Sequence, residues 1–195
     1  MKKIFFALAI FILFTMLSAS YSQQLMKDLN ENIIRLHILA QSNSEYDQKI
    51  KLEVRNEILK AVKDIDIKNS SEFLSTAQNT ANRYLNENNI SYKAKALKGK
   101  FHFPQKTYNN ITLPSGEYNG IRIVLGEGKG ENWWCIMYPP LCVTQSGGLN
   151  TNKNTELKLK DSLSSDTYEL ITNDSKKIKL KFKTVEFFNK LRKQS

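Results

Sequence analysis

Two cysteines and two histidines are the side chains with which this chain could do covalent or metal chemistry: Cys135, Cys142, His37 and His102. A cysteine hydrolase requires a thiolate beside a basic imidazole, so either cysteine with either histidine as base forms one enzyme hypothesis. A zinc site requires ligand pairs at short spacing, which neither pair has. No pair of carboxylates stands out at a strand end for a cell-wall hydrolase. We therefore expect no metal and no other cofactor.

The N-terminal segment predicts export. Residues 1–20 combine a basic start, an apolar run over 4–17 and a small-residue end, Ser18-Ala19-Ser20, which is the layout of a signal peptide. The apolar run is shorter than the roughly 20 residues that span a bilayer, so an uncleaved anchor is the alternative. We expect cleavage of this signal peptide, a polar spacer over 21–31 that packs poorly, and one secreted domain over 32–195.

Export also bears on the cysteines. In an oxidising compartment cysteines tend to pair, and a bond between Cys135 and Cys142 would close a short loop. Such a bond is worth about 2 to 3 kcal/mol if it is unstrained. We expect this disulfide in preference to a catalytic thiol.

The net charge of +10 and the pI near 9.5 favour an anionic partner surface. Export argues against nucleic acid, which leaves peripheral contact with an anionic membrane or the cell wall. The lysines are scattered, with no arginine-rich cluster. A lysine-rich surface that only serves solubility is the alternative, and we favour it.

An unusual stretch over residues 126–142 holds both tryptophans, both cysteines and two of the four prolines. Residues 132–138 suit a packed strand, which the two consecutive prolines must end. Successive strand residues face opposite sides, so one of Trp133 and Trp134 belongs to the core and the other is an interface anchor. Burial of both is the alternative. The candidate partner contacts in this stretch are Asn132, Trp133, Trp134, Tyr138, Pro139 and Pro140.

A second candidate site follows from a strand predicted over residues 32–40. Alternation places Arg35 and His37 on one face, and apolar residues on both faces favour a position inside a sheet. The strand end and the following helix start attract anions, so Arg35, His37 and Asn43 are candidate ligands for a carboxylate of a partner. The alternative, which we favour slightly, is that the histidine and arginine satisfy neighbouring carbonyls in a half-buried strand.

Helical spacing and turn residues complete the fold. Ser44 and Asp47 match a helix cap, and the helix runs to about residue 63 with an inner stripe that begins Tyr46, Ile50, Val54. The other predicted elements are a second helix capped near residue 70, strands over 92–103, 120–125 and 132–138, a flexible polar segment over 145–177, a strand over 178–182 and a terminal helix. The fold class is α/β (α+β): a single domain with a mixed, mostly antiparallel sheet, an antiparallel helix pair on one face and a short C-terminal helix.

Three segments together resemble a known family, the stage II sporulation protein R family of endospore-forming bacteria. The resemblance covers about residues 32–143 and again the end of the chain, and its most specific part is the run from Trp-Trp-Cys to Pro-Pro-Leu-Cys. The residues that carry it are Ile33 to Ser44 with Asp47, Lys51, Val54 and Arg55; Glu131 to Cys135 with Tyr138 to Cys142; and Phe182 to Phe188.

The resemblance implies a developmental signal and no enzyme. Members of the family are made in the forespore and secreted across its membrane into the intermembrane space. They are needed to activate a membrane-embedded aspartic protease, which processes the precursor of the mother-cell sigma factor. The resemblance carries no catalytic residues to this chain. The alternative function is a secreted cell-wall or Cys–His hydrolase acting during sporulation.

Overall fold

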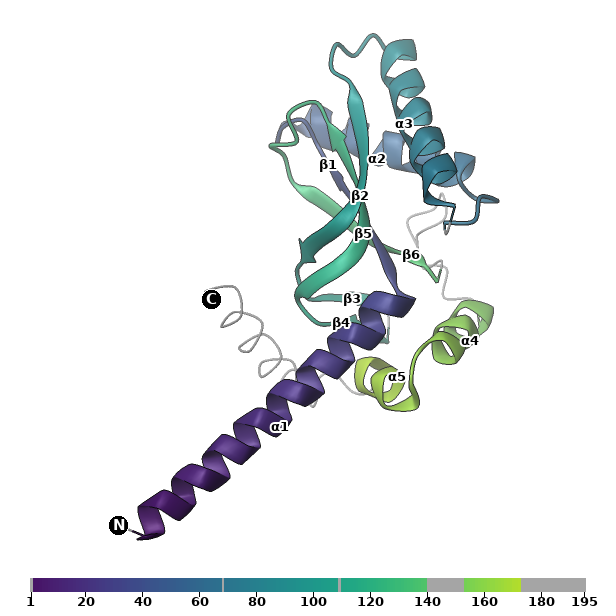
Figure 1. Ribbon diagram of the computed structural model, residues 1–195. Helices are drawn as coiled ribbons and strands as arrows, with labels where there is room; N and C mark the ends of the chain where they lie inside the picture. Colours follow the sequence, from purple (N-terminus) through teal and green to yellow (C-terminus); the bar gives the residue numbers. More distant parts are fainter. Residues whose placement is uncertain (1, 68, 109, 140–152, 173–195) are drawn as a thin grey trace. The chain divides into compact units, whose positions relative to one another are not determined.

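The computed structural model describes residues 2–67, 69–108, 110–139 and 153–172 (Figure 1). The chain divides into two compact units. One takes in residues 1–32, 102–117 and 159–195, and the other residues 33–101 and 118–158. We expected a single domain over residues 32–195, and the division into two compact units does not test this prediction.

A four-stranded mixed sheet organises the fold. Its strands are β1 (Ile34–Leu39), β2 (Ala94–Phe103), β5 (Gly116–Leu125) and β6 (Asn132–Tyr138), in the order β2-β5-β1-β6. The central strand β1 runs parallel to β5 and antiparallel to β6. Apolar residues on both faces of β1 predicted this inner position, because only a strand covered on both sides buries both sets of side chains. The α+β fold class is confirmed.

Helices α2 (Glu45–Ala61) and α3 (Ser70–Glu87) pack against each other on one face of this sheet (Figure 1). Ser44 is the N-cap of α2, as predicted, and its side chain accepts a hydrogen bond from Asp47 N at 3.1 Å. The main core lies between these helices and the sheet. Its fully buried members include Leu36, Ile38, Val54, Ile58, Phe73, Ala77, Ala81, Leu85, Ile123 and Leu125.

The inner stripe of α2 differs from the expected one in its first turn. Tyr46 is 59% exposed, whereas Asp47 and Lys51 are buried and Ile50 begins the apolar stripe. The reason is local: the Asp47 carboxylate accepts hydrogen bonds from Ser42 and Tyr92, which hold that position against the sheet side of the helix. A polar residue with several partners can take a buried position that periodicity assigns to an aromatic residue.

The unit that contains the N-terminus has helix α1 (Lys2–Asn32), the short strands β3 (Lys106–Tyr108) and β4 (Ile111–Leu113), and helix α5 (Ser165–Thr172). The strands β3 and β4 pair antiparallel. Helix α4 (Lys153–Ser162) spans the division between the units.

The described residues 21–31 and 153–172 differ from two expectations for this part of the chain. The spacer over 21–31 does not pack poorly: it continues α1 and buries Leu25 and Leu29. The polar segment over 145–177 contains α4 and α5, with Leu159 and Ile171 fully buried. These segments are tied together, because Asp28 accepts hydrogen bonds from the backbone N and the hydroxyl of Ser164 at 3.0 and 2.7 Å.

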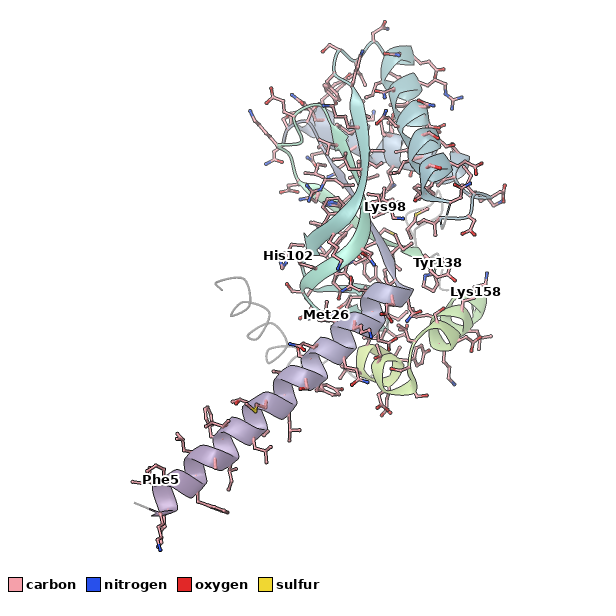
Figure 2. All side chains as sticks on the ribbon, viewed as in Figure 1. Phe5, Met26, Lys98, His102, Tyr138 and Lys158 are labelled. Atoms are coloured by element: carbon pink, nitrogen blue, oxygen red, sulfur yellow. The ribbon has the colours of Figure 1, made fainter. Side chains whose placement is uncertain are left out.

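Helix α1 is long and apolar enough to cross a membrane, and it is the one such helix among the described residues. Its most apolar stretch has a mean hydropathy of 2.2. Figure 2 shows Phe5 on the N-terminal part of this helix, and the apolar side chains from Ile4 to Leu17 are largely exposed. This segment is compatible with the predicted signal peptide. The strand predicted over 178–182 and the terminal helix lie outside the described residues.

Candidate functional site

The β1 register places three functional side chains side by side on the sheet face opposite the helix pair. His37 lies opposite Arg122 of β5 on one side and opposite Trp134 of β6 on the other. Arg35 shares this face with His37, because strand residues two apart point the same way. The predicted common face of Arg35 and His37 is therefore confirmed.

The His37 imidazole is held by contacts on several sides. It stacks on the Trp134 ring with centroids 4.9 Å apart and planes at 15°, and the Phe101 ring lies at 5.2 Å. Arg122 donates a hydrogen bond from Nε to His37 Nε2 at 2.8 Å. His37 is 2% exposed, so water has little access to this ring.

These contacts keep His37 neutral. Burial lowers the pKa of His37 to about 4, the positive charges of Arg122 and Arg35 act in the same direction, and a hydrogen bond with the Asn132 side chain opposes them. Because Nε2 accepts the hydrogen bond from Arg122, we assign the ring proton to Nδ1. A general base needs a free lone pair and a pKa near the working pH, and this imidazole has neither.

Two arginines accompany the histidine, each lying over an aromatic ring. The Arg122 guanidinium carbon lies 4.0 Å from the Phe101 centroid, and that of Arg35, which is fully buried, lies 4.8 Å from the Tyr118 centroid. Such cation–π contacts stabilise a cation most where water is excluded. We name the group on this face the arginine–aromatic cluster: Arg35, His37, Phe101, Tyr118, Arg122 and Trp134.

The opposite face of the sheet carries Trp133 and Cys135. The Trp133 ring packs against the main core under Arg55 of α2, whose guanidinium carbon lies 4.9 Å from the ring centroid. Trp133 and Trp134 thus face opposite sides, as predicted, and both are half-buried, so the role of one of them as an interface anchor stays a prediction. Tyr138 is half-buried and Pro139 buried, while Pro140 lies outside the described residues.

The position of Cys135 excludes one enzyme hypothesis. Cys135 is 1% exposed in the core between the sheet and the helices, whereas His37 projects from the other face. The sheet backbone therefore separates this thiol position from this imidazole, and Cys135 with His37 cannot form a nucleophile–base pair. Cys142 lies outside the described residues, so its pairing with Cys135 stays a prediction. His102 is exposed, with Ser115 Oγ 3.3 Å from its Nε2.

Asn43 has a structural contact of its own. Its Oδ1 accepts a hydrogen bond from Glu131 N at 2.7 Å, and Gly130 N donates to Ala40 O at 2.9 Å. Lys51 Nζ adds a hydrogen bond to Glu131 O at 3.0 Å. These bonds join the turn after β1 to the turn before β6. Asn43 thus contacts this turn, whereas Arg35 and His37 contact the rings of the cluster.

The start of α2 is already supplied with an anion from the chain itself. The Asp47 carboxylate accepts hydrogen bonds from Ser42 Oγ at 2.5 Å and Tyr92 OH at 2.9 Å. Burial raises the pKa of Asp47, but the hydrogen bonds from Ser42, Tyr92 and Ser44 outweigh it and hold the pKa below its usual value. This ionised carboxylate lies in the first turn of α2, where the helix dipole favours it, and binding of a partner's acid near this turn stays a prediction.

Sequence reasoning missed Arg122, Phe101 and Tyr118 as members of the site. The alternation of Arg122 with apolar residues marked it as a strand residue, but only the parallel register of β1 with β5 brings it to His37.

Among the described residues, no three histidine, cysteine, aspartate or glutamate side chains are grouped so that they could hold a metal ion.

Comparison with known proteins adds a family to this geometry. The family model described as "Stage II sporulation protein R" matches residues 30–147, a range that contains the whole arginine–aromatic cluster. The "Stage II sporulation protein R" of Bacillus subtilis (strain 168) is 36% identical over 121 residues, which are 57% of this chain and 54% of the relative. The chain thus spans about half the length of this curated relative. No solved structure matches this chain.

Proposed function

This chain belongs to the stage II sporulation protein R family, and on that basis we propose that it is a secreted sporulation signal that binds and activates a membrane-embedded aspartic protease. In this proposal the forespore exports the chain into the intermembrane space and the signal peptide is cleaved. The bound protease then processes the precursor of the mother-cell sigma factor. The apolar helix at the N-terminus is compatible with such export.

The observation that supports binding over catalysis is the state of His37. Its acceptor nitrogen is occupied by Arg122 Nε at 2.8 Å, its pKa lies near 4, and Cys135 is on the other face of the sheet. A histidine that is buried, neutral and hydrogen-bonded at Nε2 can support a binding surface but is poorly suited to transfer protons. The function that this geometry favours is recognition of another protein.

We propose the face with the arginine–aromatic cluster as the contact surface, with Trp134 as its anchor. Tryptophan and arginine are enriched among the residues that dominate the binding energy of interfaces. Trp133 serves the core instead, because it packs under α2. A disulfide from Cys135 to Cys142 would tie the chain after Pro139 back to β6 and fix the edge of this surface.

Activation requires that the signal bind the active form of the protease more tightly than the inactive form. A ligand shifts a conformational equilibrium only by its difference in affinity for the two states. A shift from about 1% to about 99% active protease needs a difference of about 10⁴-fold. Stabilisation of a protease dimer is one arrangement that supplies such a difference.

The test is reconstitution in a non-sporulating bacterium that expresses the full chain, the membrane protease and the sigma factor precursor. We expect precursor cleavage only when all three are present. A version without residues 1–20 should leave cleavage at background, because it is not exported. Cleavage that proceeds equally without the chain would contradict the proposed function.

A further inference from the structure

Arg122 is a half-buried cation with no acidic partner among the residues that the structure describes. Among the described ion pairs none involves Arg122, and its hydrogen-bonded neighbour, His37, is neutral. Charged side chains that are partly removed from water are usually paired, because a lone charge loses hydration without compensation. The cation–π contact with Phe101 offsets part of that loss and leaves the net charge in place.

The geometry of Arg122 leaves its terminal nitrogens available. Nε donates to His37 Nε2 at 2.8 Å, and the guanidinium lies over the Phe101 ring at 4.0 Å. Neither terminal nitrogen donates a hydrogen bond to another side chain or carbonyl of the described chain. A guanidinium fixed at Nε and along one flat face is oriented in advance, so little side-chain entropy is lost when two parallel hydrogen bonds form.

Arg55 provides the contrast within the same unit. It also lies over an aromatic ring, that of Trp133, but its Nε and Nη2 both donate to Asn56 Oδ1, at 3.1 and 2.8 Å. Its donors on that side are therefore satisfied by the chain itself. The two arginines share charge, a ring contact and an internal acceptor at Nε, and they differ at the terminal nitrogens: Nη2 of Arg55 donates to Asn56, whereas neither terminal nitrogen of Arg122 has such an acceptor among the described residues.

We propose that Arg122 is a binding site for a carboxylate of the protein partner, an aspartate or glutamate side chain that it holds through its two terminal nitrogens. This inference rests on the proposed function and names the chemistry that the partner presents. Phe101 lies against the guanidinium of Arg122, so the acid is expected to sit among apolar neighbours in the partner. Exclusion of water by those neighbours strengthens the charge-assisted hydrogen bonds.

A protein carboxylate fits this site better than an anionic lipid surface. Binding to a bilayer draws on several cations that reach one plane, whereas the cluster presents one half-buried guanidinium, that of Arg122 over the Phe101 ring, and keeps Arg35 fully buried. Of the exposed lysines of β2, Lys98 and Lys100 are at even positions and point away from the face of Phe101, whereas Lys95 shares the odd parity of Phe101.

The first experiment compares three full-chain variants in the reconstituted cleavage system: Arg122→Gln, Arg122→Lys and Arg55→Gln. Loss of one member of a desolvated charge pair should lower activation by at least about thirtyfold in Arg122→Gln. Arg122→Lys should retain only part of the activity, because lysine keeps the positive charge but cannot form two parallel hydrogen bonds to one carboxylate. Arg55→Gln should stay within about twofold of wild type. Secreted amounts and melting temperatures show that each variant folds.

The decisive experiment exchanges the charges of Arg122 and of its proposed acidic partner in the protease. Arg122→Glu should be inactive, and replacement of one acidic residue in the extracytoplasmic segments of the protease by arginine should restore at least a tenth of wild-type cleavage. Failure of every such replacement to restore cleavage would overturn the inference, as would equal losses in Arg122→Gln and Arg55→Gln.

Three further outcomes separate the possibilities. Tenfold weaker binding of Arg122→Gln than of wild type to phosphatidylglycerol vesicles would assign the site to lipid and overturn the carboxylate proposal. If wild type itself fails to trigger cleavage, the proposed function fails. If wild type triggers cleavage and Arg122→Gln equals it, only the carboxylate inference fails.

Discussion

Arg122 donates a hydrogen bond from Nε to Nε2 of His37 at 2.8 Å, so a permanent cation lies against an imidazole that it helps to keep neutral. This pair joins β5 to β1 by side chains as well as by backbone. It also fixes which nitrogen of the histidine carries the proton. Predictions for pH, for the two tryptophans, for the cysteines and for the turn before β6 follow from this pair and its surroundings.

Stability should fall as pH drops from about 6.5 to about 4. The pKa of His37 is lowered to about 4 in the folded chain, so between these values the unfolded chain binds more protons than the folded one. The stabilisation from neutral His37 is present above pH 6.5 and lost by pH 4, and it amounts to about 3 kcal/mol at most. Urea unfolding across this range measures it.

His37→Gln is the matched variant for that measurement, because glutamine keeps an acceptor oxygen for Arg122 and does not titrate. The pH dependence of the free energy of unfolding should be smaller in the variant by the contribution of His37. Identical pH profiles for the two proteins would contradict the assignment of a neutral, buried imidazole.

Trp134→Ala and Trp133→Ala should fail in different ways. Trp134→Ala removes the ring that stacks on His37 at the proposed contact surface, so we expect precursor cleavage to fall at least tenfold with secretion unchanged. Trp133→Ala should destabilise the domain by about 2 kcal/mol, since a half-buried ring is lost from the core. Thermal unfolding and the cleavage assay separate the two effects. Equal loss of cleavage in both variants at equal stability would contradict the division of roles.

The secreted protein should contain a bond between Cys135 and Cys142. Without reductant, neither thiol should react with iodoacetamide, and reduction should add the mass of two hydrogens. Cys142→Ala should lower the free energy of unfolding by about 2 to 3 kcal/mol, which corresponds to a melting temperature about 5 to 10 °C lower. A reactive thiol at either position in the unreduced protein would show that the bond is absent.

Gly130→Ala should destabilise the turn before β6. A Cβ at this position would lie 2.2 Å from Ser42 O, a backbone atom that cannot move aside cheaply. We expect a loss of about 2 kcal/mol or more, because strain of this kind shifts backbone on both sides of the contact. Gly99→Ala is the control, since its added Cβ would come no closer than 3.3 Å to the Phe101 side chain. Denaturant midpoints of the two variants provide the comparison.

Sequence patterns were sufficient where one local signal decides the structure. The alternation around His37 predicted β1 and its two faces, Ser44 predicted the start of α2, and the prolines after Tyr138 predicted the end of β6. Each of these features depends on residues within a few positions of one another. The two tryptophans on opposite faces follow from the same rule.

Sequence patterns failed where the partner lies far along the chain. Arg122 and His37 meet through a parallel pairing that no local pattern encodes, so the central hydrogen bond of the site was not predicted. Tyr46 was assigned to the core because periodicity takes no account of the hydrogen bonds that bury Asp47. The helices within 145–177 were missed because polar residues dominate their composition, and their anchoring comes from Asp28 at a distant position.

The hydrogen bonds that Asn43 and Ala40 accept from Glu131 N and Gly130 N have a consequence for exchange of segments between relatives. The turn after β1 and the turn before β6 each depend on the other for their conformation. A chimera that takes only residues 40–44 from another family member would pair them with a turn at 127–131 that does not match them. A chimera that takes both segments would keep their hydrogen bonds matched.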